Sequence, residues 1–173
     1  MDWGQLLTGL VGAGIGTAIV EATVTLYGSF KTNRGYAKFL AFRIAVQLEE
    51  FAQSCSNRLD EISNNMSSSG AMGSLYDRLP AFPAYPEDAE GWRNVSPEVM
   101  HLAYQVRVKY DSAQEGLRFV SHEFGFDEAA LECATYCANV GLEAARVARG
   151  IRQQYGFPAL GAQLEEKLEA SSS

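Results

Sequence analysis

The sequence predicts an all-α protein in which a single N-terminal transmembrane helix is followed by a three-helix bundle with long helices and a long, proline-rich connecting loop. Residues 6–30 contain one side chain that is charged at neutral pH, Glu21, and about 20 apolar residues suffice to cross a bilayer core. Three later segments repeat apolar residues at steps of three and four, which places them on one helix face. We therefore divide the chain into an anchor at 1–30, a helical body at 31–158 and a flexible acidic tail at 159–173.

The residues that flank the apolar stretch favour a membrane span with a defined orientation. Trp3 and Tyr27 are placed as interface anchors, because aromatic rings favour the boundary between lipid and water. Residues 22–48 contain no acidic residue. They contain four basic ones: Lys31, Arg34, Lys38 and Arg43. Because an excess of Lys and Arg marks the cytoplasmic end of a span, we expect an inner or plasma membrane protein with its N-terminus outside and its bundle in the cytoplasm.

Small residues recur through the apolar stretch at the spacing used for close packing of membrane helices. Gly12 and Gly16 form a G-x-x-x-G pair, and other four-residue steps also link small residues. The predicted packing residues are Gly9, Gly12, Gly14, Gly16 and Ala18. Their spacing predicts helix–helix contact in the membrane, including self-association.

Glu21 is an intramembrane carboxylate in this interpretation, and a charged carboxylate inside a span is costly. One hypothesis is that Glu21 handles protons or ions, or pairs with a partner helix. The other is that Glu21 is protonated, or extends its side chain toward the inner headgroups.

Residues 11–22, VGAGIGTAIVEA, also resemble the opening of flavin-binding Rossmann proteins, with Thr17 in place of the third glycine of G-x-G-x-x-G. That resemblance implies a strand before the loop, a helix after it and an acidic residue about 20 positions further on. Residues 31–34 contain no acid, and no later segment forms a second βα unit. A nucleotide-binding loop is one alternative to the membrane span, and a glycine-rich helix buried in a soluble assembly is the other.

Cap residues and apolar spacing predict the helices of the body. The expected ranges are about 36–64, 96–124 and 127–155. Gly28, Gly35 and the polar residues between them predict a break before the first helix. Ser96 followed by Pro97 begins the second helix. Gly125 ends it.

The last of these helices carries a seam of small residues. Its members are Ala130, Ala134, Cys137, Gly141, Ala144 and Ala148. Small side chains permit helices to approach closely, so we expect this helix to lie centrally or tightly against a partner. The short junction before it makes the last two helices antiparallel neighbours, whereas the first and second helices are either parallel or antiparallel.

The loop at 65–95 is long, and long loops in compact domains are usually functional or disordered. Its prolines lie three residues apart, which favours a left-handed extended helix. One hypothesis makes this segment a docking strap for a partner. The strap residues are Pro80, Phe82, Pro83, Tyr85 and Pro86. The alternative is a strap that packs its own apolar residues, Leu79, Phe82, Tyr85 and Trp92, onto the bundle.

Residues with catalytic or ligating chemistry do not form a recognisable site. Cys55 and Cys137 lie on the apolar stripes and Cys133 is one turn from Cys137, so we expect three buried cysteines. His101 and His122 lie off the apolar stripe and are expected on the surface. We therefore predict no catalytic residue, no metal site and no cofactor. The net charge of −7 argues against nucleic-acid binding, and no small-molecule substrate is evident.

These patterns predict a non-enzymatic function. The chain is expected to be a single-pass, membrane-anchored helical protein that acts as an interaction or assembly subunit, with a protein partner or further copies of itself. One alternative is a small oligomeric membrane effector or channel-like subunit that uses the glycine-rich span. A further alternative is a helical subunit of a soluble complex in which the glycine-rich helix is buried. The remaining hypothesis is a helical enzyme or metal protein that uses His122 with Cys133 and Cys137.

Overall fold

The computed structural model describes residues 15–158 and 163–172, with side chains over 32–158 and 164–171. All regular structure in these residues is helical. The helices are α2 (Ile15–Ser67), α3 (Ala89–Asn94), α4 (Pro97–Glu123), α5 (Phe126–Tyr155) and α6 (Gln163–Ser172). The predictions of an all-α class and a helical bundle are therefore confirmed.

Within the described residues, no helix combines the length and the apolar character that crossing a bilayer requires. The structure therefore gives no support to the predicted transmembrane helix. Trp3, Gly9, Gly12 and Gly14 lie outside the described residues. Gly16, Ala18, Glu21 and Tyr27 belong to the backbone of α2, and their side chains are not among those described.

The predicted break at residues 28–35 is wrong, because α2 runs without interruption from Ile15 to Ser67. A Cβ added at Gly35 would meet nothing within 4 Å, so this glycine serves no close contact in the described structure. A glycine inside an exposed helix costs only about 1 kcal/mol relative to alanine. Extending an existing helix also avoids the cost of starting a new one. The buried turns that begin at Ala37 therefore carry the helix through Gly35.

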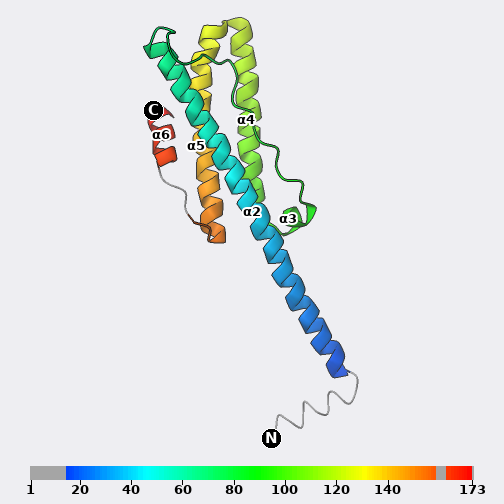
Figure 1. The fold of residues 1–173 in the computed structure, drawn as a ribbon. Helices are drawn as coiled ribbons and strands as arrows, with labels where there is room; N and C mark the ends of the chain where they lie inside the picture. The colour runs from blue at the N-terminus through cyan, green and yellow to red at the C-terminus, as the bar shows by residue number, and fades with distance from the viewer. Residues whose placement is uncertain (1–14, 159–162, 173) are drawn as a thin grey trace.

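The chain forms a bundle in which α2 and α4 run in one direction and α5 returns in the other (Figure 1). The connection between α2 and α4 descends the length of the bundle and includes the short helix α3. This long return path makes α2 and α4 parallel, which settles the direction that the sequence left open. Helix α5 packs against α2, α4 and α6, as predicted for the helix with the small-residue seam.

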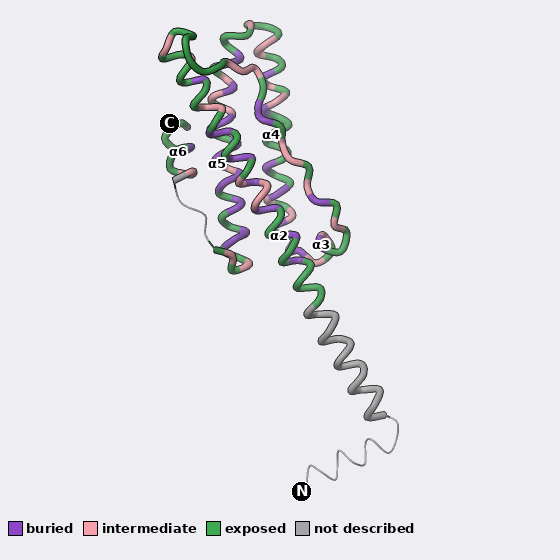
Figure 2. Tube along the Cα trace, in the orientation of Figure 1, coloured by how far each residue is buried: buried purple, intermediate pink, exposed green. Residues whose placement is uncertain are grey.

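The core lies where the inner faces of α2 and α5 meet. The apolar stripe of α2 is buried at Leu40, Ile44 and Leu48, and buried positions line the inner faces of the helices (Figure 2). Gly141 of α5 lies directly against α2, because a Cβ added there would stand 2.8 Å from the Cβ of Cys55. The seam of small residues therefore lets two helix backbones approach closely at this point.

The expected flexible tail contains a helix that belongs to the bundle. Leu168 of α6 is fully buried, 3.3 Å from the position that a Cβ of Gly141 would occupy. Two ion pairs join α6 to α5: Arg146 with Glu169 at 2.6 Å and Arg149 with Glu165 at 2.7 Å. The sequence predicts a frayed acidic helix from Gln163 followed by disorder, and it does not show that Leu168, which stands among acidic residues, packs into the bundle.

A nearly buried ion pair joins α2 to α5 near the base of the bundle. Arg152 is 8 % exposed and donates two hydrogen bonds to Glu49, one of them from Nη2 to Oε2 at 2.8 Å. Its Nη1 also donates to the carbonyl of Pro158 at 3.0 Å. The Glu49 carboxylate raises the pKa of Arg152. This fork geometry fixes the register of the two helices.

The contact at Gly141 predicts opposite effects for the same substitution at two glycines of α5. Gly141→Ala is expected to destabilise the fold by about 1–3 kcal/mol, because its Cβ would overlap Cys55. Gly150→Ala is the matched control, since its Cβ would enter open space, and it should stabilise by about 0.5–1 kcal/mol. Urea unfolding followed by circular dichroism measures both changes. Equal effects of the two variants would contradict the close approach.

The Arg152–Glu49 pair predicts a large difference between two ion pairs on the same helix. Arg152→Met is expected to cost about 3 kcal/mol, because Glu49 would keep a charge with little water around it. Arg146→Met is the matched control, since the side chains of Arg146 and its partner Glu169 are 48 % and 52 % exposed, and it should cost less than about 1 kcal/mol. The same urea titrations compare the two. A cost below 1 kcal/mol for Arg152→Met would show that the pair does not hold the helices together.

Candidate binding cleft beside the strap

The predicted strap residues lie on the chain's own bundle. Pro80 and Pro86 are buried, and Phe82, Pro83 and Tyr85 are half-buried. Phe82 lies between Phe51 of α2 and Tyr110 of α4, with ring centroids 5.0 Å and 5.2 Å away. The alternative in which the strap, residues 79–86, packs onto its own bundle therefore describes the structure.

Hydrogen bonds also hold the strap along its length. The Tyr85 hydroxyl donates to the carbonyl of Ala103 at 2.5 Å. Gln47 of α2 donates from Nε2 to the carbonyl of Ala84 at 3.1 Å. Burial of Tyr85 raises the pKa of its hydroxyl, so the group stays a hydrogen-bond donor through the neutral range. The strap occupies the position that a fourth helix would have in a larger bundle.

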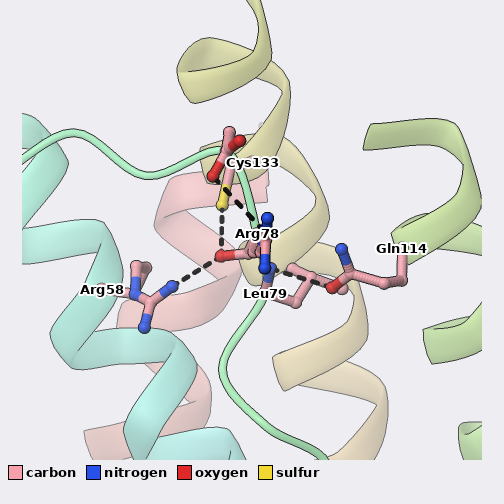
Figure 3. A network of polar contacts seen from close by, with 6 residues as sticks. Arg58, Arg78, Leu79, Gln114 and Cys133 are labelled. Carbon is pink, nitrogen blue, oxygen red and sulfur yellow. Dashed lines mark hydrogen bonds and ion pairs between the residues drawn. The ribbon is translucent and has the colours of Figure 1, made fainter. Parts of the chain in front are cut away.

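The beginning of the strap is held by three helices at once (Figure 3). The carbonyl oxygen of Arg78 accepts from Arg58 of α2 at 2.5 Å and from the thiol of Cys133 of α5 at 3.2 Å. The next backbone N–H, of Leu79, donates to Oε1 of Gln114 of α4 at 3.2 Å. These bonds fix the backbone from which the Arg78 side chain extends.

A surface cleft opens between this fixed backbone and the second half of α4. Its volume is about 620 Å³, within the range of small-molecule sites. The segment that leads into the strap contributes Asp77, Arg78, Leu79 and Ala81. Helix α4 contributes Tyr110, Gln114, Arg118, Ser121 and His122. The cleft thus combines donor groups on two elements with a short apolar wall.

The two arginines of the cleft are only weakly paired within the described residues. The side chain of Arg78 is 79 % exposed and stands 3.8 Å from the Asp77 carboxylate. Arg118 has no ion pair, hydrogen bond or ring contact among the described residues. Between Lys38 and Lys167, each other Lys and Arg in the described part of the chain has a carboxylate, carbonyl or ring partner. Positive charge is therefore exposed here in a chain of net charge −7.

A second cleft, of about 580 Å³, lies between α4 and α5. Its lining includes Lys109, Glu143 and Arg146. Lys109 is paired with Glu143 at 2.7 Å, and Arg146 is paired with Glu169 of α6 at 2.6 Å. Both cations are therefore already matched by carboxylates. This leaves the cleft beside the strap as the better candidate for binding a charged ligand.

The cysteines and histidines lie where the sequence places them. Cys55, Cys133 and Cys137 are buried and free, while His101 and His122 are exposed. A hydrogen bond with Cys137 and burial together raise the pKa of Cys133, so its thiol is a poor nucleophile. The described residues contain no group of three or more His, Cys, Asp or Glu side chains arranged to hold a metal ion.

The chain matches no family model, no curated protein and no solved structure. The sequence alone also did not indicate the cleft. Tyr110, Gln114, Arg118 and His122 follow one another at steps of four, so they share a face of α4. That stripe is a usable signal, but only the folded strap brings Arg78 beside it.

Tyr85 predicts a specific loss of stability in alkali. Its pKa in the folded chain lies above the value of about 10 for an exposed tyrosine. Below pH ~10 both states hold the proton, and above it the unfolded chain loses the proton first. The free energy of unfolding should therefore fall as the pH rises above about 10, by up to roughly 1.4 kcal/mol per pH unit from this group. Tyr85→Phe should remove this part of the pH dependence in urea unfolding.

The same substitution has a second readout at neutral pH. Tyr85→Phe loses the bond to Ala103 and should destabilise by about 1 kcal/mol. Tyr104→Phe is the matched control at pH 7, because it removes a hydroxyl from an exposed ring of α4, and it should cost less than about 0.5 kcal/mol. An alkaline profile of Tyr85→Phe that matches the unmodified chain would contradict the burial of this hydroxyl.

Proposed function

We propose that this chain is a single-pass, membrane-anchored helical protein whose bundle binds a partner and does not catalyse a reaction. The proposal joins two parts of the chain. The N-terminal residues have the composition of a membrane span. The bundle is closed by its own strap and exposes a cleft with donor groups.

The unbroken course of α2 is the observation that carries the proposal. Residues 32–36 are exposed, and α2 continues past the base of the bundle toward Ile15 (Figure 1). The sequence ahead of Lys31 contains only two charged side chains, those of Asp2 and Glu21. An isolated apolar helix is not stable in water. This segment therefore needs a cover, which a bilayer or other helices would supply.

The residues where α2 leaves the bundle favour a bilayer as that cover. Tyr36 and Phe39 are exposed at 43 % and 58 %. The guanidinium of Arg43 lies 5.7 Å from the centre of the Phe39 ring. Exposed aromatic and basic residues next to an apolar segment are typical of the cytoplasmic interface of a span. The proposed location is therefore the inner or plasma membrane, with the bundle on the cytoplasmic side.

The groups of the cleft support binding over catalysis. Guanidinium, amide and hydroxyl groups donate hydrogen bonds to anions and other acceptors. They do not act as nucleophiles while they keep their protons. The thiol nearest to the cleft, Cys133, is buried and donates its hydrogen bond to Arg78. The His122 side chain is 84 % exposed and is paired with its neighbour Glu123. Among the described residues no hydroxyl or thiol is hydrogen-bonded to this ring, so it has no nucleophile to activate.

Cell fractionation tests the anchor. The full chain is expected to sediment with membranes and to resist an alkaline wash until detergent is added. Ile15→Lys combined with Ile19→Lys should release it, because each lysine near the centre of a span costs about 3 kcal/mol. Val108→Lys combined with Phe119→Lys is the matched control on exposed positions of α4, and it should stay in the membrane fraction.

Release of the unmodified chain by the alkaline wash would contradict the proposal. The apolar segment would then be covered by protein, as in a soluble helical complex. Release of both double variants would show that added positive charge detaches the chain wherever it is placed. Attachment would then not depend on the apolar segment, which would also contradict the proposal.

A further inference from the structure

We propose that the cleft between the strap and α4 binds the phosphate group of a small phosphorylated molecule. This site is separate from the apolar N-terminal segment. It lies toward the end of the bundle opposite the one from which α2 extends (Figure 1). It therefore does not depend on how the chain is attached to a membrane.

Charge is the first argument. Arg78 and Arg118 line the cleft from two different elements, and Arg118 has no ion pair, hydrogen bond or ring contact among the described residues. The carboxylate of Asp77 is the only one among the lining residues, and it is 3.8 Å from Arg78. Two guanidinium groups stabilise a doubly charged phosphate more strongly than a singly charged carboxylate.

The available donors are the second argument. Gln114 uses its Oε1 to accept from Leu79, which leaves its NH₂ group as the end that can donate to a ligand. Ser121 and His122 add a hydroxyl and a ring N–H from the next turn of α4. Phosphate offers three terminal oxygens that accept several bonds from different sides. Donors on both sides of a cleft can therefore bond a phosphate group more completely than a planar carboxylate.

The rigidity of the cleft is the third argument. The backbone that carries Arg78 is fixed by its bonds to Arg58 and Cys133 (Figure 3). Tyr110, on the opposite wall, is packed against Phe51 with ring centroids 5.7 Å apart. The walls of the cleft are therefore preformed, and binding has to order mainly the side chains of Arg78 and Arg118.

The size and the apolar wall of the cleft identify the class of ligand. A volume of about 620 Å³ leaves room for much more than a phosphate ion. Leu79, Ala81 and the ring of Tyr110 form the apolar part of the lining. The ligand is therefore a phosphomonoester whose organic part packs on this wall, rather than free phosphate.

Isothermal titration calorimetry of the full chain in mild detergent tests this assignment with three probes. Phenyl phosphate is expected to bind saturably at one site. Inorganic phosphate should bind more weakly, because it does not contact the apolar wall. Benzoate, which has the ring but a single negative charge, should also bind more weakly.

Arg118→Gln is the decisive variant, since Arg118 has no partner in the described structure to lose. It should keep the thermal stability of the unmodified chain and weaken the binding of phenyl phosphate by about tenfold or more. Arg93→Gln is the matched control. Its side chain is 74 % exposed on α3, outside the cleft, and pairs only with Glu90. It should leave the affinity unchanged.

Three outcomes would overturn the assignment. The first is that phenyl phosphate does not bind saturably in the millimolar range. The second is equal affinity for Arg118→Gln and the unmodified chain. The third is that benzoate or inorganic phosphate binds as tightly as phenyl phosphate. Equally tight binding of benzoate would exclude a preference for phosphate. Equally tight binding of inorganic phosphate would exclude a contribution from the organic part of the ligand.

Discussion

The close approach of α5 to α2 is the constraint on which the rest of the structure depends. Because Gly141 carries no side chain, the two backbones meet at Cys55, and the small residues of α5 let it contact three other helices. The buried Leu168 of α6 then covers the same point from outside. A bulkier seam would hold these helices apart and leave the apolar residues of α2 without a full set of neighbours.

The strap follows from the same arrangement. Helix α5 fills the centre, and the groove between α2 and α4 is filled by an extended segment in place of a fourth helix. Proline suits that role, because it fixes an extended backbone that needs no internal hydrogen bonds. Phe82 supplies the apolar volume, between Phe51 and Tyr110. The cleft exists because an extended chain covers less of α4 than a helix would.

Patterns that depend on one segment were predictable from the sequence, and pairings between distant segments were not. The Ser96 cap bonds the backbone N–H of Val99 as its sequence indicates, and the stripes of α2 and α5 are buried. The continuity of α2 was missed, because the glycine signal at Gly35 is weaker than the cooperativity of a long helix. The bonds that place Arg78 beside α4 join residues 20 and 55 positions apart, and no local spacing encodes them.

Helix α2 is one uninterrupted helix, and this continuity joins distant parts of the structure. Its 53 residues span about 80 Å, and the stretch through Gly35 has the same helical geometry as the rest. The turns of α2 that extend from the bundle therefore belong to the same helix as Phe51 and Arg58. Arg58 bonds the carbonyl of Arg78. One continuous helix thereby both extends from the bundle and holds the backbone beside the cleft.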